Sequence, residues 1–223
     1  TQRRVLTAAQ LKSMSDDDIN NSAKLGLLDN QAAATSTQSL SSVIPSIAEA
    51  EAIFNYMARQ CCKLSGPYDV DYCISFQYCE DGCYARAQKM GYIFNTTYHY
   101  SLHKVFSFAN AGSDELCVEA EKWGGCCINW WYHVAPLLNV QTTTGIKAYV
   151  FDPAMFDQPI LLSVWLHAQE NPACAGYYTP HVSMINLQPQ SSYSPSDYTG
   201  LHFDTDPNFI STDYTLSSYA SLS

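Results

Sequence analysis

The chain has 223 residues, of which 47% are apolar, 13% aromatic and only 14% charged, as in a folded globular protein with a sizeable core. Its net charge is -10 and it contains no basic cluster, so nucleic acid and anionic membrane surfaces are poor partners. No apolar run is long enough to span a bilayer, and the polar segment that begins at Thr1 is not a signal peptide. An exported protein would already have lost its leader.

Nine cysteines and the absence of any C-x-x-C spacing bear on the compartment and on metals. Low charge with many Tyr, Ser and Thr residues is typical of a secreted, extracellular protein, in which several disulfides form. Inert buried thiols in a reducing cytosol are the alternative. Eight cysteines can pair, and the ninth is then a reactive thiol or an intermolecular link. We expect neither a structural zinc site nor another cofactor.

The chain divides at about residue 43. Residues 1–42 contain a short helix start at Ser15 and then, from Asn30 to Ser42, a stretch without periodicity that is typical of a linker. We interpret 1–42 as an N-terminal arm or a pro-segment remnant with its linker, and 43–223 as the catalytic domain.

The main segment predicts an alternation of helices and strands. Ser46 begins a capping box before a helical pattern of apolar residues. Further helices are predicted over 83–94 and 160–169, and strands over 72–76, 102–108, 128–140 and 146–151, the last two forming a hairpin. This order indicates an α+β fold in which the helix that starts at Cys83 packs on an antiparallel sheet.

Cys83 is the candidate nucleophile. It follows Asp81 and Gly82 in what looks like a turn feeding a helix, and a helix N-terminus stabilises a thiolate and offers N–H groups to an oxyanion. Gly82 would allow a substrate to approach closely, so we assign it to substrate binding. The alternative for Cys83 is half of a disulfide.

His133 is the candidate base, since a cysteine nucleophile needs a group that takes its proton and returns it to the leaving amine. On a continuous strand over 128–140, Trp131 would share its face with His133, and we predict that Trp131 forms a wall of the cleft. Asp152, held extended before Pro153 at the end of the next strand, could orient the imidazole. A histidine on a half-buried sheet and an ordinary turn aspartate are the alternatives.

Three separated segments carry a family resemblance. Residues 81–87 (DGCYARA), 126–135 (CCINWWYHVA) and 152–156 (DPAMF) resemble the nucleophile, histidine and aspartate motifs of bacterial secreted protein-glutaminases, which deamidate protein glutamine. The likeness runs in order over about residues 43–222. It implies a papain/transglutaminase-like fold, with Cys83 as nucleophile, His133 as base and acid, and Asp152 as the orienting group.

The resemblance also implies the reaction and the partners. A protein or peptide glutamine would form a thioester with release of ammonia, and water would then release glutamate. We expect a monomer in which residues 1–42 could inhibit the site, because the family is made with a pro-segment that plugs the cleft. Cys62 and Cys73 resemble a paired position. A cysteine peptidase, a transglutaminase and a non-catalytic secreted binding or toxin module remain alternatives.

Overall fold

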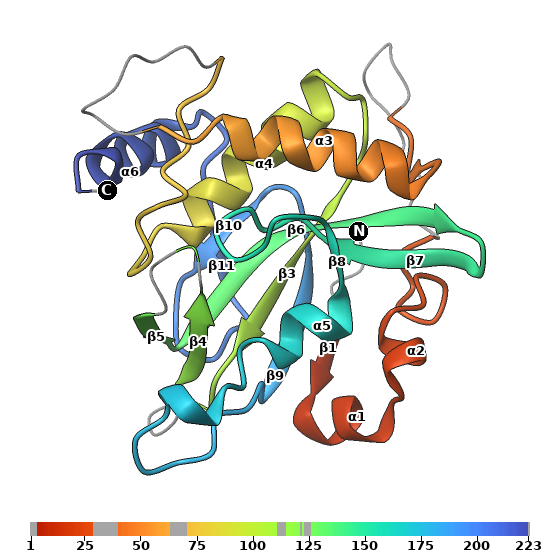
Figure 1. Cartoon of the computed structure of the whole chain (residues 1–223), viewed down its shortest axis with the longest axis vertical. Helices are drawn as coiled ribbons and strands as arrows, with labels where there is room; N and C mark the ends of the chain where they lie inside the picture. The colour runs from red at the N-terminus through yellow and green to blue at the C-terminus, as the bar shows by residue number, and fades with distance from the viewer. Residues whose placement is uncertain are drawn as a thin grey trace.

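The computed structural model describes residues 4–28, 40–62, 71–110, 115–120, 122 and 126–222 (Figure 1). Its helices are α1 (Ala8–Ser13), α2 (Asp16–Ile19), α3 (Ile47–Arg59), α4 (Cys83–Thr96), α5 (Leu162–His167) and α6 (Ile210–Ala220), with a 3-10 turn at Pro172–Cys174. Its strands are β1 (Arg4–Thr7), β2 (Val43–Ile44), β3 (His103–Phe108), β4 (Leu116–Ala120), β5 (Cys126–Trp130), β6 (Tyr132–Thr142), β7 (Gly145–Val150), β8 (Ile160–Leu161), β9 (Met184–Pro189), β10 (Ser192–Pro195) and β11 (Phe203–Thr205). The predicted mixture of helices with a mainly antiparallel sheet is confirmed.

A seven-stranded sheet organises the molecule, in the order β1-β9-β3-β6-β7-β8, with β2 pairing in parallel with the far half of β6. β6 is the central strand: its first half pairs with β3 and its second half with β7. Two small two-stranded sheets, β4-β5 and β10-β11, stand apart from it. The β6-β7 hairpin is the one that the sequence predicts.

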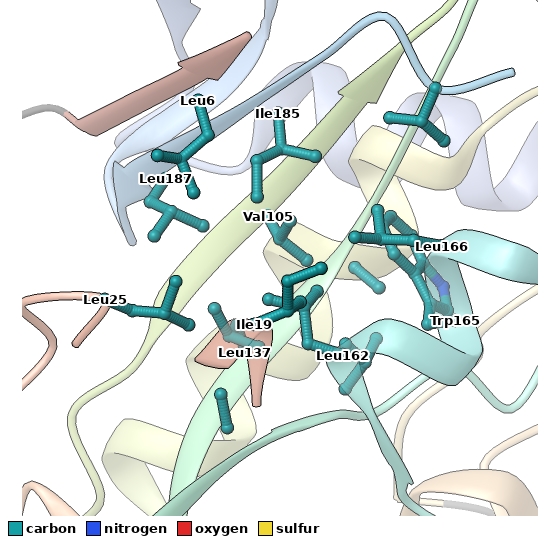
Figure 2. Close-up of a cluster of buried hydrophobic side chains, with 14 of the residues drawn as sticks. Leu6, Ile19, Leu25, Val105, Leu137, Leu162, Trp165, Leu166, Ile185 and Leu187 are labelled. Carbon is teal, nitrogen blue, oxygen red and sulfur yellow. The ribbon is translucent and has the colours of Figure 1, made fainter. Parts of the chain in front are cut away.

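The sheet is covered on both sides, so alternate residues of β6 enter different cores. Ala135 and Leu137 belong to a cluster with the α5 side chains Leu162 and Trp165, shown in Figure 2. Leu138 and Val140 belong to a second cluster, whose other members come largely from α3 and α4. This alternation is what a central strand with two buried faces requires.

The two long helices of the second cluster begin where local chemistry predicts. The Ser46 hydroxyl accepts a hydrogen bond from the Glu49 N–H at 3.1 Å, and α3 follows directly. α4 begins at Cys83 after Gly82, whose φ of 88° is left-handed. In Figure 1, α3 crosses in front of α4 above the sheet, and α6 lies beside α4.

The described part of the N-terminal segment packs on this same body. β1 pairs with β9 along one edge of the sheet, and Leu6, Ile19 and Leu25 are buried in the cluster of Figure 2. Most of the predicted linker lies outside the described residues. A domain boundary at residue 43 therefore stays a prediction, while the arm itself contributes a strand and core side chains.

Two local predictions are wrong. The strand expected over 128–140 is broken at Trp131, so that β5 pairs with β4 and only β6 enters the main sheet. Because β5 and β6 pair in two different sheets, the chain has to bend between them. The strand expected over 72–76 is reduced to a single bridge between Cys61 and Ile74.

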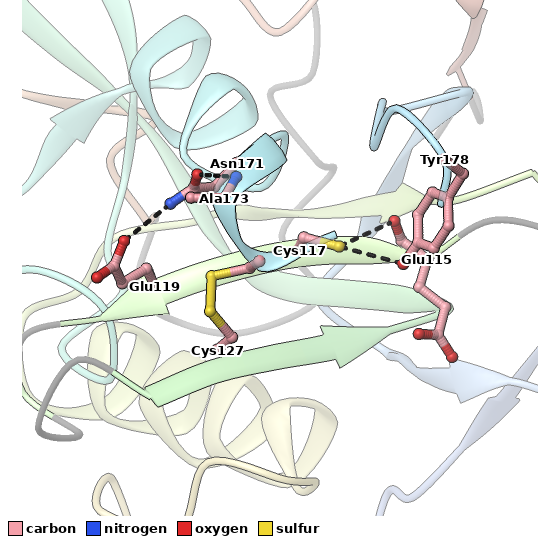
Figure 3. Close-up of a disulfide and its surroundings, with 8 residues drawn as sticks. Glu115, Cys117, Glu119, Cys127, Asn171, Ala173 and Tyr178 are labelled. Atoms are coloured by element: carbon pink, nitrogen blue, oxygen red, sulfur yellow. Dashed lines mark hydrogen bonds between the residues drawn. A yellow bond between two sulfur atoms is a disulfide. The ribbon is translucent and has the colours of Figure 1, made fainter. Parts of the chain in front are cut away.

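The described residues form two disulfides. Cys62 is bonded to Cys73, as the resemblance implies, and Cys127 on β5 is bonded to Cys174 (Figure 3). Cys117 is buried without a disulfide, and its sulfur lies 3.2 Å from the Tyr178 hydroxyl. The odd number of cysteines therefore did not identify Cys83 as the leftover thiol, because Cys117 is also outside a disulfide.

Candidate active site

Cys83 is the first residue of α4 and makes no disulfide. Its side chain is 8% exposed, and it packs in a small cluster with Ala87, Phe106 and Val134. The sulfur therefore lies at the positive end of a helix of fourteen residues, over the start of β6. That position suits a thiolate.

His133 and Asp152 form a buried pair. Nε2 of His133 lies 2.8 Å from Oδ2 of Asp152, and the two residues are only 1% and 4% exposed. The same Asp152 oxygen accepts a hydrogen bond from the indole N–H of Trp165 at 2.9 Å. One carboxylate oxygen thus holds the imidazole while Trp165 holds the carboxylate.

The second nitrogen of His133 is the one available for chemistry. Nδ1 is buried and makes no hydrogen bond within the described part of the chain. Burial lowers the pKa of His133, but the Asp152 charge and hydrogen bond, with smaller contributions from Cys83, raise it to about 9. Burial raises the pKa of Asp152, while the His133 charge and hydrogen bonds from His133 and Trp165 lower it below its usual value. The site therefore favours a charged imidazolium–carboxylate pair beside Cys83.

The aromatic surroundings of His133 differ from the prediction. Trp130, which a continuous strand would put on the opposite face, stacks on the imidazole with ring centres 4.5 Å apart. Trp165 stacks on the ring as well, at 5.4 Å. Trp131 lies at the break between β5 and β6 and packs against Phe108 and Tyr198. The break at Trp131 removes the alternation on which the shared face rested.

A pocket of about 480 Å³ opens beside Cys83. It is lined by Tyr78, Glu80, Asp81, Cys83, Arg86, Glu115, Asn129, Trp130, Trp131, Tyr132 and Tyr219. Trp131 is one of these lining residues, and its role as a wall for the substrate stays a prediction. Gly82 is not among the lining residues, and its N–H donates to Oδ1 of Asp81 at 2.6 Å.

Arg86 fixes the loop that leads into the nucleophile. Its Nη1 donates to three backbone carbonyls, those of Ser75, Tyr78 and Asp81, at 3.3, 2.9 and 2.9 Å. The side chain is 2% exposed, and its charge also lowers the pKa of Asp152. These contacts tie the segment before Cys83 to the first turn of α4.

Three neighbours of the site were missed from the sequence. Trp165 is fully buried, and a buried indole N–H needs an acceptor, which is the signal that could have linked it to Asp152. Tyr132 lies beside Cys83, and burial followed by the Cys83 charge raises the pKa of its hydroxyl well above the usual value. Tyr219 comes from the far end of the chain.

The described residues contain no group of three or more acidic, histidine or cysteine side chains placed to hold a metal ion. None of the helices in the described ranges has the length and apolar character needed to cross a membrane. The pocket also receives no side chain from residues 4–28 or 40–42.

Comparison with known proteins agrees with this geometry. Residues 50–169 match the family described as glutaminase. The NMR structure of protein-glutaminase from Chryseobacterium proteolyticum is 30% identical, with a TM-score of 0.67, and the match covers 81% of this chain and 90% of that one. A crystal structure of protein-glutaminase is 31% identical over the same shares, with a TM-score of 0.66.

The pro-forms match a larger share of this chain. A crystal structure of pro-protein-glutaminase is 27% identical, with a TM-score of 0.69, and the match covers 96% of this chain and 68% of that one. A crystal structure of a mutant pro-protein-glutaminase is 30% identical, with a TM-score of 0.69. That match covers 87% of this chain and 64% of the mutant chain. No curated protein sequence matches significantly. The family match over more than half of the chain, with solved relatives matched over 90% of their length, means that this chain belongs to the protein-glutaminase family.

Proposed function

We propose that this protein deamidates the side chain of glutamine in proteins or peptides, through a thioester on Cys83. The observation that carries the proposal is the His133–Asp152 pair. Nε2 of His133 is held at 2.8 Å from Asp152, Nδ1 makes no hydrogen bond among the described residues, and Cys83 interacts with the same imidazole. A base oriented by a buried carboxylate next to a thiol at a helix start is the arrangement that nucleophilic catalysis needs.

The steps balance without a cofactor. His133 holds the proton given up by Cys83, as an imidazolium, and the sulfur attacks the amide carbon of glutamine. The imidazolium then protonates the amide nitrogen, which leaves as ammonia and gives the thioester. Water, deprotonated by His133, attacks the thioester carbonyl, and the sulfur leaves with the proton from the imidazolium as glutamate is released.

The oxyanion of each tetrahedral intermediate would form at the start of α4. The first N–H groups of a helix have no partner within the helix, and they point toward negative charge at its N-terminus. Trp131 would form one wall for the substrate side chain, and Gly82 would shape the turn that exposes the sulfur. The same constellation supports the interpretation of the fold as papain/transglutaminase-like.

Paired variants test the reaction. Cys83→Ser should fold and lose ammonia release, since a serine hydroxyl is far less acidic than a thiol. Cys117→Ser is the matched control, because Cys117 is also buried outside a disulfide but lies away from the pocket lining. The readouts are ammonia release and the mass of a glutamine-containing protein, which rises by roughly one dalton for each amide converted to acid. Ammonia release by Cys83→Ser at the wild-type rate would refute the proposal.

The same experiment separates the alternatives. Cleavage of the substrate chain would indicate a peptidase, and crosslinking to an amine would indicate a transglutaminase. A wild-type protein whose Cys83 reacts with no alkylating agent would favour a non-catalytic binding module.

Secretion and the role of residues 1–42 belong to the proposal as well. The disulfides Cys62–Cys73 and Cys127–Cys174 support an oxidising compartment. The larger share of this chain matched by the pro-form, 96% against 81%, supports residues 1–42 as a pro-segment remnant. Deletion of 1–42 tests it: a raised kcat would indicate inhibition, while an unchanged kcat with lower stability would indicate a docked remnant.

A further inference from the structure

We propose that Tyr219, in the C-terminal helix α6, is a positioning residue that fixes the turn presenting Cys83. The inference rests on the proposed role of Cys83 as nucleophile and extends the site beyond the Cys83, His133 and Asp152 side chains. Its starting point is a hydrogen bond of 2.6 Å from the Tyr219 hydroxyl to Oδ2 of Asp81, across 138 residues of sequence.

Asp81 transmits this contact to the nucleophile turn. While Oδ2 accepts the Tyr219 hydroxyl, Oδ1 accepts the backbone N–H of Gly82 at 2.6 Å. Gly82 immediately precedes Cys83, and its left-handed φ of 88° sets the direction in which α4 begins. One carboxylate therefore ties the end of the chain to the residue that orients the nucleophile.

The Tyr219 ring provides a second constraint. It stacks on Tyr78 with ring centres 4.3 Å apart, and both rings line the pocket. A Cβ added to Gly82 would lie 2.7 Å from the Tyr219 ring, so the ring closes over the turn itself. Arg86 holds the same loop from the interior through the Tyr78 and Asp81 carbonyls. The turn is thus clamped between Arg86 and Tyr219.

The negative charge of Asp81 means that Tyr219 should affect the reactivity of Cys83 as well as the packing of the turn. Asp81 lies two residues before Cys83, and an unneutralised carboxylate near a thiolate disfavours the thiolate. The hydroxyls of Tyr219 and Tyr84, at 2.6 and 3.4 Å from Oδ2, and the Gly82 N–H on Oδ1 share that negative charge, and the Tyr219 bond is the shorter of the two hydroxyl contacts. Removing the Tyr219 hydroxyl should therefore raise the pH at which Cys83 becomes reactive, as well as loosening the turn.

The test compares Tyr219→Phe with Tyr214→Phe in the full-length chain. Tyr214 lies on the same helix but is 76% exposed, so it controls for the loss of a tyrosine hydroxyl. The first measurement is the rate of Cys83 alkylation by iodoacetamide against pH, located by mass spectrometry. We expect Tyr219→Phe to react roughly tenfold more slowly at neutral pH, with its midpoint moved upward, as for loss of one hydrogen bond to a charged group. Tyr214→Phe should match the wild type.

A second variant separates the effect of Tyr219 on the position of the turn from its effect on the charge of Asp81. Asp81→Asn keeps an oxygen acceptor but removes the charge, so adding Tyr219→Phe to it should leave the alkylation midpoint unchanged. On a glutamine substrate, Tyr219→Phe should lower kcat by about the same factor with little change in KM. Wild-type alkylation and kcat in Tyr219→Phe, or an equal midpoint shift with and without the Asp81 charge, would overturn the inference. Alkylation needs no glutamine turnover, so failure of the proposed reaction would be seen separately, as absence of ammonia from the wild type.

Discussion

The indole N–H of Trp165 donates to Oδ2 of Asp152, the same oxygen that holds His133. Trp165 is fully buried, and its ring also stacks on the imidazole. Trp165 therefore fixes both the Asp152 carboxylate and the plane of the His133 ring. Through this side chain, α5 on one side of the sheet influences the candidate chemistry at Cys83 on the other side.

Trp165→Phe tests that influence. The variant keeps an aromatic ring but removes the donor, and a hydrogen bond to a charged group contributes about 1.5–3 kcal/mol. We expect the free energy of unfolding to fall by about that amount, and the pKa of Asp152 to rise, because the Trp165 donor that lowers it is lost. Urea denaturation and the pH profile of kcat measure both effects. An unshifted profile in Trp165→Phe would contradict the relationship.

The His133–Asp152 pair predicts how stability depends on pH. His133 has a folded pKa of about 9, above the ordinary value of 6.5, so its contribution is complete below about pH 6.5 and is lost as the pH rises through 9. Asp152 has a lowered pKa, so its contribution is present above its ordinary value of 3.8 and is lost as the pH falls through the folded value. The pair is therefore most stabilising between these limits.

His133→Gln measures this window. Removing one partner of a buried ion pair costs about 3–5 kcal/mol. We expect a deficit of this size against the wild type at pH 6, which shrinks toward pH 10. His202→Gln, at an exposed histidine paired with Asp197, should show little deficit at any pH. A His133→Gln deficit independent of pH would show that the imidazole is neutral in the native protein.

Gly82→Ala and Gly145→Ala distinguish general backbone strain at a positive φ from an effect on the position of Cys83. Both glycines have positive φ, 88° and 112°, so an added Cβ is unfavourable at each, by about 1–2 kcal/mol. Only at Gly82 would the new carbon meet the Tyr219 ring, at 2.7 Å, because Gly145 has open space around it. We expect both variants to lose stability in urea, but only Gly82→Ala to lose kcat. Full activity in Gly82→Ala would show that the turn tolerates another conformation.

The two disulfides should differ in their contribution. Cys127–Cys174 closes a sequence separation of 47 and Cys62–Cys73 one of 11. Loop-closure entropy gives about 4 kcal/mol for the first and about 3 kcal/mol for the second. Paired Cys→Ser variants, compared by urea denaturation, should rank in that order. The reverse ranking would mean that native packing, and not the unfolded chain, determines their effect.

Local signals were enough for part of this protein. The Ser46 cap, the glycine before Cys83 and the turn between β6 and β7 each depend on neighbouring residues, and each element begins or ends as expected. The same is true of Asp152, which Pro153 holds beyond the end of β7. For this reason the sequence predicted Cys83 at a helix start, His133 on a strand and Asp152 just after the next strand.

Tertiary structure decided the contacts that cross the chain. Trp130 and not Trp131 stacks on His133, because the chain bends at Trp131 to enter a second sheet, and no periodicity within one strand reports such a bend. Trp165 and Tyr219 reach the site through helix packing on the sheet, which depends on the order of strands and not on any short window. The helix starts, the hairpin and the candidate chemical groups depend on nearest neighbours, so they can be predicted from the sequence. Which side chains surround those groups depends on packing between residues far apart in the chain, so only the folded molecule reveals it.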